Sequence, residues 1–197
     1  MTRASPSRPH SLAIAGILAA SLGLGPHIMT TAMAEDTVIA PEKNPPGDIP
    51  DSQVFIEYRS PLGFTIKVPE GWARRETKSG VTFSDKYNTV RTTIEEHVEP
   101  LTIAVVKNEL TAQLEMSGKA VRISGVTLTS VPSGPAIVIS YASNSDANPV
   151  TNKAIRLENE RYFFWKGGKL TTLTLSAPYG ADDADQWLLM AKSFRWL

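Results

Sequence analysis

Residues 169–197, KLTTLTLSAPYGADDADQWLLMAKSFRWL, contain a strand, a turn and a helix in direct succession. Threonine and leucine largely alternate over residues 170–176, which is typical of a half-buried strand. Three aspartates at 182–185 stand where the partial positive charge of a helix N-terminus favours acids. We therefore expect a C-terminal helix that docks on a sheet and is essential to the fold. Its predicted apolar stripe consists of Ala184, Trp187, Leu188, Ala191 and Phe194.

Short segments with the alternation of β-strands precede this unit. Residues 53–58 and 64–68 flank Pro61-Leu62-Gly63 and predict a hairpin with one buried face. Gly167-Gly168 predicts a second hairpin, because two consecutive glycines suit a two-residue turn. Residues 136–141 are apolar at both parities, so this strand should lie mid-sheet with cover on both faces. The predicted strands are 53–58, 64–68, 81–84, 89–98, 121–131, 136–141, 154–165 and 170–176.

One segment between the strands has helical periodicity. Pro100 suits a first helical position, and the residues after it are apolar at intervals of three and four. These apolar residues are Ile103, Val106, Leu110 and Leu114. We predict a helix over residues 100–116, although residues 102–106 alone also fit a strand. Mostly antiparallel strands with one helix inserted and one at the end predict an α+β sandwich.

Two stretches resemble the PsbP-like superfamily, which also includes Mog1 and DcrB-type periplasmic proteins. GFTIKVPEGW, residues 63–72, is similar to the F-x-I/V-x-x-P-x-G-W opening of that superfamily. Residues 169–197 resemble its closing strand, Ala-Pro turn and helix ending in Ser-Phe. The match covers roughly Ser52 to the C-terminus. The resemblance implies a central, mainly antiparallel sheet with helices on both faces, an α/β/α sandwich used as a binding or accessory module rather than as an enzyme.

Residues 1–34 have the three parts of a secretory signal peptide. Two arginines and no acid precede an uncharged, largely apolar run at 12–25, and Ala32-Met33-Ala34 forms an A-x-A cleavage site. The run is shorter than the roughly 18–20 residues of a spanning helix, so an uncleaved anchor is the less favoured alternative. We expect cleavage between Ala34 and Glu35. The product should be a soluble periplasmic or secreted protein without a transmembrane segment.

The chain beyond residue 34 divides by composition into a spacer and a domain. Residues 35–51 contain four prolines and little apolar content, which predicts an extended spacer that need not pack. Residues 52–197 have the length of a single domain.

Composition excludes several classes of chemistry. The 197 residues contain no cysteine, so disulfides, thiolate metal sites, a cysteine nucleophile and a lipid-modified cysteine are excluded. The 20 basic and 20 acidic residues balance, and this argues against a nucleic-acid-binding protein.

Glu95, His97 and Glu99 are the weak candidates for a metal site. They are spaced two apart within a predicted strand, which places all three side chains on one face. His97 is the only histidine beyond residue 34, and without a second nitrogen or sulfur ligand a solvated strand edge is the favoured interpretation. The aspartates at 182–185 are likewise better explained by the helix start than by calcium. We expect no metal and no cofactor.

No arrangement typical of a catalytic site is present. Ser140, Ser143 and Ser145 lack a G-x-S-x-G frame, and His97 has no identifiable orienting partner, so we name no catalytic residue and expect no enzyme activity. Arg74 and Arg75 follow Trp72 in a predicted polar loop. Solvated side chains are a simpler interpretation of these two arginines than an anion-binding site.

Two features are candidates for partner binding. Residues 142–153, ASNSDANPVTNK, are the longest polar interruption of the domain, and binding residues gather on such loops. In the aromatic run 162–165, alternate residues face opposite sides of the strand. The hydrophobic core is the favoured location for these side chains. If the strand extends past the helix that covers the sheet, one pair would instead form an exposed apolar patch. We predict one binding surface from the loop and the neighbouring strand through Trp165. Its candidate residues are Asn144, Asp146, Asn148, Asn152, Phe163 and Trp165.

The sequence therefore predicts an exported, non-catalytic binding or accessory protein of the extracytoplasmic space. Its partner would be an unidentified envelope or extracellular protein. Two alternatives remain open. One is an envelope enzyme whose site is assembled from residues distant in sequence, and the other is a small-ligand carrier with a pocket between sheet and helix.

Overall fold

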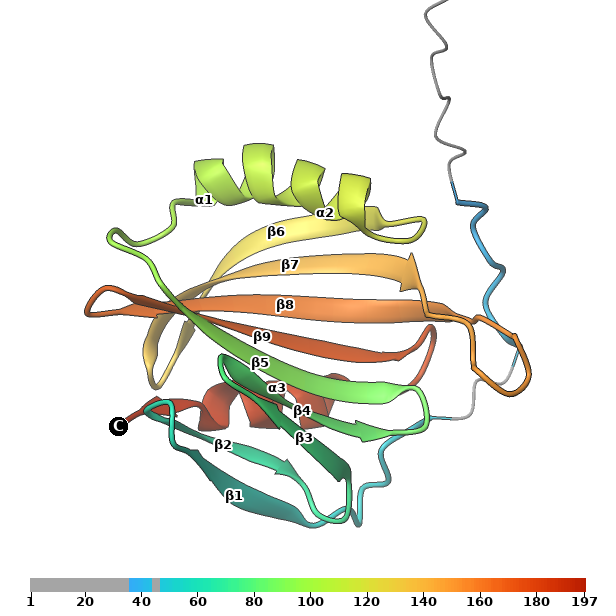
Figure 1. Cartoon of the computed structure of the whole chain (residues 1–197), viewed down its shortest axis with the longest axis horizontal. Helices are drawn as coiled ribbons and strands as arrows, with labels where there is room; N and C mark the ends of the chain where they lie inside the picture. Colours follow the sequence, from blue (N-terminus) through green and yellow to red (C-terminus); the bar gives the residue numbers. More distant parts are fainter. Residues whose placement is uncertain (1–35, 44–46) are drawn as a thin grey trace, which may run out of the picture. The chain divides into compact units, whose positions relative to one another are not determined.

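The computed structural model of the chain describes residues 36–43 and 47–197, which belong to the compact unit Glu35–Leu197 (Figure 1). The predicted signal peptide, residues 1–34, lies outside the described residues. In the described ranges, no helix combines the length and apolar character required to cross a bilayer.

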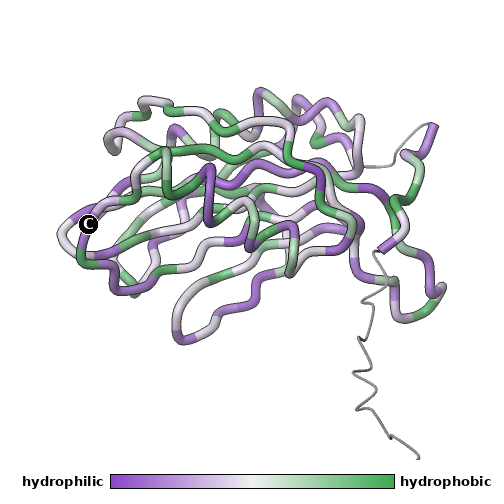
Figure 2. Tube along the Cα trace, turned by 90° about the horizontal axis from the view of Figure 1, so that it is seen from above, coloured by the Kyte–Doolittle hydropathy of each residue, from purple (hydrophilic) through white to green (hydrophobic). Residues whose placement is uncertain are grey.

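A seven-stranded antiparallel sheet forms the centre of the described structure (Figure 1). The Gly167-Gly168 turn joins its last two strands, with φ of +57° and +81° at the two glycines, as the sequence predicts. Figure 2 shows hydrophobic and hydrophilic residues alternating along the chain. In spatial order the strands are β3 (Ala73–Thr77), β4 (Gly80–Asp85), β5 (Asn88–Glu96), β9 (Lys169–Pro178), β8 (Arg156–Lys166), β7 (Gly134–Asn144) and β6 (Arg122–Val131).

One face of this main sheet is covered by the C-terminal helix and a small second sheet. The helix is α3 (Ala184–Ser193), and the second sheet contains β1 (Phe55–Ser60), β2 (Phe64–Pro69) and β10 (Arg195–Trp196). Their shared core is apolar and rich in aromatic rings, with Phe64, Phe164 and Phe194 fully buried. The predicted hairpin and C-terminal helix are therefore confirmed.

The buried face of α3 differs from the predicted stripe at two positions. Trp187, Ala191 and Phe194 are buried, but Ala184 is exposed and Leu188 is 43% exposed. Met190 is fully buried instead. The prediction that Ala184 and Leu188 belong to the buried stripe is wrong, because the sheet contacts the neighbouring side of the helix.

The other face of the main sheet is covered by the mid-chain helical segment. It consists of α1 (Ile103–Val105), a π-helical turn η1 (Val106–Leu110) and α2 (Thr111–Ser117). Val106 and Leu114 pack with Ile137, Ile139 and Phe163 in a second core. Helices thus lie on both faces of an α+β sandwich.

The helix begins three residues later than the sequence predicts. Thr102 is the N-cap residue, and its Oγ1 accepts a hydrogen bond of 3.2 Å from the backbone N–H of Val105. Pro100 therefore precedes the helix instead of occupying its first position. A threonine side chain that satisfies an otherwise unpaired N–H fixes the start at Ile103.

Several strands differ from the sequence prediction, and three of the differences move candidate residues: β3 was not predicted, and β5 and β7 end at other residues. All five residues of β3 are exposed, so this edge strand lacks alternation; Arg74 and Arg75 lie on it rather than in a loop. β5 ends at Glu96, so His97 and Glu99 lie beyond the strand. β7 continues to Asn144, which makes the first three residues of the predicted 142–153 loop part of a strand.

The proline-rich segment contacts the domain, contrary to the expectation of a spacer that need not pack. Ile49 is buried in the core, and its backbone N–H donates to Asp183 Oδ1 at 2.6 Å. Nearer the start of the segment, the side-chain amide of Asn144 donates to the carbonyl of Thr37 at 2.8 Å and accepts from the backbone N–H of Ile39 at 3.2 Å. We call residues 36–43 the strap.

Asp183 should make stability depend on pH. Burial raises the pKa of the Asp183 carboxyl above its ordinary 3.8. The hydrogen bond from Ile49 lowers this pKa, and the nearby negative charges of Asp48 and Asp182 raise it. The folded state then binds this proton more tightly than the unfolded state. The stabilisation that comes from binding this proton is present at low pH and is lost as the pH rises through the pKa of Asp183 in the folded state.

Asp183→Asn should therefore raise the free energy of unfolding at pH 7 more than at pH 4, because it removes the buried charge and keeps an acceptor for Ile49. Urea unfolding at both pH values measures the difference. The exposed Asp185→Asn is the matched control. An equal effect of Asp183→Asn at both pH values would contradict the assignment.

Candidate functional site

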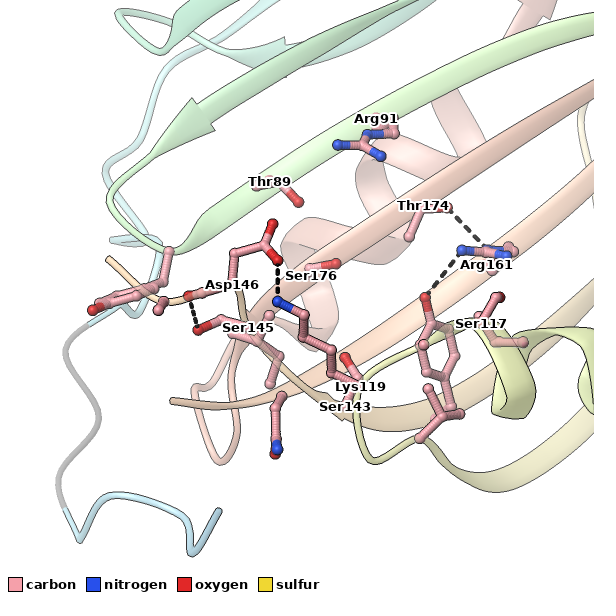
Figure 3. A pocket seen from close by; sticks show the side chains of 18 of the residues that line it. Thr89, Arg91, Ser117, Lys119, Ser143, Ser145, Asp146, Arg161, Thr174 and Ser176 are labelled. Atoms are coloured by element: carbon pink, nitrogen blue, oxygen red, sulfur yellow. Dashed lines mark hydrogen bonds and ion pairs between the residues drawn. The ribbon is translucent and has the colours of Figure 1, made fainter. Parts of the chain in front are cut away.

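The helices on the second face leave one part of the main sheet uncovered. The helical segment lies beside β6 and β7 in Figure 1, and its core contacts come mainly from β7 and β8. At the end of the sheet near the 142–153 loop, this leaves a basin of about 610 Å³ (Figure 3). The basin is lined by β5, β7, β8 and β9, by residues 117–121 and by residues 144–149 of the loop.

Strand alternation determines which side chains line the basin. Thr89 and Arg91 of β5 line it, whereas Val90 between them is buried in the core beneath α3. On β9, Thr174 and Ser176 line the basin in the same way. In each of these two strands, the apolar residues thus point into the core and stabilise the fold, and the polar residues between them point into the open part of the sheet.

Arg161 is held in place on the floor of the basin. Its Nε donates to Thr174 Oγ1 at 3.2 Å, and its Nη2 makes a longer contact of 3.4 Å with Tyr141 Oη. The guanidinium carbon lies 5.7 Å from the centroid of the Tyr141 ring, within cation–π range. The half-buried Arg161 has no ion pair with an acidic side chain of the described residues. Its orientation is therefore fixed by neutral groups.

Arg91 adds a second guanidinium from the neighbouring part of the sheet (Figure 3). Burial raises the pKa of Tyr141, and the positive charges of Arg161 and Arg91 act against that increase. Lys119 lowers the pKa of Asp146 through a hydrogen bond of 2.7 Å, and Arg91 contributes in the same direction. Both arginines thus influence the electrostatic potential of the same basin.

The loop residues predicted for partner binding have different positions. Asn144, Asp146 and Asn148 line the basin, but Asn152 does not. Asn144 is bonded to the strap and accepts from Arg156 Nη1 at 3.1 Å, and Asp146 pairs with Lys119. Asn148 Oδ1 accepts from the backbone N–H groups of residues 150 and 151, so its side chain stabilises the loop itself.

Phe163 and Trp165 lie at the other end of β8. The strand runs from Arg156 beside the loop to Lys166 at the Gly167-Gly168 turn, a span of ~30 Å at ~3.3 Å per residue. The structure does not bring the loop and Trp165 together into one surface.

Phe163 and Trp165 instead line a separate apolar cavity of about 280 Å³ near Leu101, Ile103 and Leu170. The indole N–H of Trp165 donates to the carbonyl of His97 at 2.8 Å. Phe163 belongs to the second core, as the alternation of the aromatic run favours.

The Glu95, His97 and Glu99 trio does not share one strand face, because β5 ends before His97. The His97 Nδ1 is in hydrogen-bond contact with the carbonyl of Glu99, and both glutamates are exposed. Within residues 36–43 and 47–197, no group of three histidine, cysteine or acidic side chains is placed to hold a metal ion.

Sequence reasoning missed Tyr141, Arg91 and Arg161. One signal was available: Arg161 has the same parity as Phe163 and Trp165, so a charge stands on a face otherwise predicted to be core. That the helices leave this end of the sheet uncovered depends on tertiary structure, which no local pattern reports.

With a central antiparallel sheet, helices on both faces and a small sheet closing one of them, the chain has the PsbP/Mog1-like fold. Among solved structures it is similar to cyanobacterial PsbP (CyanoP) from Synechocystis sp. PCC 6803, with a TM-score of 0.54 and 14% identity over 77% of this chain and 98% of that one. No family model and no curated protein matches the sequence.

Two further structures align less closely. The Ran-binding protein Mog1p of Saccharomyces cerevisiae has a TM-score of 0.49 and 11% identity, covering 74% of this chain and 96% of that one. LpqN of Mycobacterium tuberculosis, involved in cell envelope biogenesis, has a TM-score of 0.44 and 13% identity, covering 73% and 89%. The likeness to CyanoP, at this identity, establishes the fold alone.

Proposed function

We propose that this chain is an exported, non-catalytic binding protein that uses the basin to recognise a molecule of the extracytoplasmic space. The observation that carries the proposal is a concave, polar part of a sheet that contains two arginines without an acidic partner among the described residues. Export rests on the signal-peptide pattern of residues 1–34. Binding proteins commonly place such groups on a rigid scaffold beside a loop.

The chemistry of the basin favours binding over catalysis. Two of its hydroxyl groups bond to an amide side chain: Ser176 Oγ donates to Asn159 Oδ1 at 2.6 Å, and Ser143 Oγ accepts from the same amide group at 3.0 Å. The hydroxyls of Thr174 and Tyr141 contact the Arg161 guanidinium, which cannot act as a base. The acid that lines it, Asp146, is paired with Lys119. His97 lies beyond the opposite end of β5, so it is far from these hydroxyls. Among the described residues, no basin hydroxyl is hydrogen-bonded to a general base.

A small-ligand carrier is the second candidate function. The cavity of about 280 Å³ at Phe163 and Trp165 lies between the sheet and the start of α1, close to the lower end of the roughly 300–1,000 Å³ typical of ligand pockets. Its lining is apolar, so such a ligand would also be apolar.

Position-specific photocrosslinking tests the basin as the recognition surface. A photoreactive residue at Ala147, an exposed position that lines the basin, should crosslink a partner in the intact envelope of cells that express the chain. The matched control is Lys166, which is exposed at the other end of β8. The intact mass of the exported protein should correspond to a chain that starts at Glu35. The same crosslinked species from both positions would contradict the proposal, and so would the absence of both a crosslinked partner at Ala147 and a small molecule bound in the basin.

A further inference from the structure

We propose that the basin binds an oxyanion carried by a hydroxyl-rich small molecule, namely a phosphorylated or carboxylated sugar. The proposal rests on the function proposed above, because it assigns the ligand class of the same site. Charge, geometry and size of the basin each support it.

The charge of the basin is unbalanced. Four basic side chains and one acidic side chain line it: Lys86, Arg91, Lys119, Arg161 and Asp146. The pairing of Lys119 with Asp146 cancels one charge of each sign, which leaves three positive charges. The full chain has 20 basic and 20 acidic residues, so this excess is a local property of the basin. A concave surface of one sign concentrates ligands of the opposite sign.

Arg161 is pre-organised to receive an oxyanion. The Thr174 hydroxyl and the Tyr141 ring and hydroxyl already position its guanidinium. A guanidinium has five N–H donors in a planar fork, and the contacts with Thr174 and Tyr141 leave donors for a ligand. Because the side chain is half-buried and positioned by neutral groups, a bound anion would supply the missing counter-charge without costly reordering.

The size and hydroxyl content of the basin indicate a larger ligand than a single ion. Its volume of about 610 Å³ lies within the roughly 300–1,000 Å³ typical of small-molecule sites. The remaining polar lining is mainly neutral, with Thr89 on β5, Ser143 on β7, and Thr174 and Ser176 on β9. Hydroxyl groups both donate and accept, which matches the hydroxyls of a sugar.

The test compares four probes by calorimetry and NMR titration of the purified protein. The probes are glucose 6-phosphate, glucuronate, inorganic phosphate and neutral glucose. We expect at least one of the two anionic sugars to bind at least about tenfold more tightly than either glucose or inorganic phosphate. Raising the salt concentration should weaken that binding. Binding of neutral glucose with equal affinity, or no binding of either anionic sugar, would overturn the proposal.

Substitutions locate the binding in the basin. Arg161→Gln should reduce the affinity for the anionic sugar at least about tenfold, since charged hydrogen bonds are lost. Arg161→Lys keeps the positive charge but loses the planar guanidinium. Its affinity should therefore lie between that of the unsubstituted protein and that of Arg161→Gln. Arg91→Gln removes an exposed charge and should weaken binding with unchanged melting. Arg75→Gln, exposed on β3, is the matched control.

The outcomes separate this proposal from the proposed function. Equal affinities of the Arg161→Gln, Arg91→Gln and Arg75→Gln variants would overturn the ligand assignment. If crosslinking at Ala147 succeeds while neither anionic sugar binds, the basin remains a recognition surface and the ligand class is wrong. If an anionic sugar binds through Arg161 while crosslinking identifies no partner, the ligand class holds and a macromolecular partner is excluded for the basin.

Discussion

Replacing Phe194 by alanine should lower the free energy of unfolding by about 3–5 kcal/mol, the typical cost of deleting a buried aromatic side chain. Phe194 is fully buried just after α3. Its ring stacks on Phe164 of β8 at 4.4 Å and on Phe64 of β2 at 5.6 Å, and meets Trp196 edge-on at 5.3 Å. One side chain therefore joins the main sheet, the small sheet and the C-terminal helix.

Chemical unfolding in urea measures this effect. Leu188→Ala is the matched control, because Leu188 belongs to the same helix but is 43% exposed, and its loss should change stability by no more than about 0.5 kcal/mol. If the two substitutions cost the same, the aromatic cluster around Phe194 would not be the joint between the layers.

Hydrophobic periodicity predicts most of this fold correctly because the elements that carry it bury one face each. The 64–68 strand and the C-terminal helix have apolar residues at the spacing of their buried faces, and both are present. β3 was missed for the same physical reason: ARRET is exposed on both sides of an edge strand, so burial imposes no pattern on it. The burial of Met190 instead of Leu188 depends on how α3 is rotated against the sheet, which spacing alone does not fix.

The candidate site was predicted only in part. The polar composition of the 142–153 loop indicates surface exposure, and three of its predicted residues do line the basin. Trp165 was grouped with them because it lies on a neighbouring strand, but strand direction places it at the far end of the sheet. Arg91 and Arg161 are separated by 70 positions, and they approach each other only because β9 pairs with both of their strands. No spacing rule connects two such positions.

The strap shows a limit of composition as a guide. Prolines and low apolar content predict an extended segment, and residues 36–43 contain no helix or strand. Composition does not reveal that a side-chain amide can replace a neighbouring strand by pairing with backbone groups. Asn144 does this at the end of β7, where it bonds to the backbone of Thr37 and Ile39.

Asn144→Ala should therefore lower the free energy of unfolding by about 2–3 kcal/mol and release the strap. The substitution removes two bonds to the strap backbone, typically worth ~1 kcal/mol each, and one bond from the buried Arg156. Hydrogen exchange should report faster exchange at the Ile39 amide, whose acceptor is lost. Asn108→Ala, exposed on the helical segment, is the matched control for stability and exchange.

This substitution also separates two roles for Asn144. The sequence predicts a partner-binding residue at this position, and in the structure its side chain bonds to the strap and to Arg156. If its role is to hold the strap, Asn144→Ala should accelerate exchange at Ile39 and leave crosslinking from Ala147 and sugar binding near their original levels. Loss of crosslinking with an unchanged Ile39 exchange rate would instead make Asn144 a recognition residue, because the side chain would then act on the partner rather than on the strap.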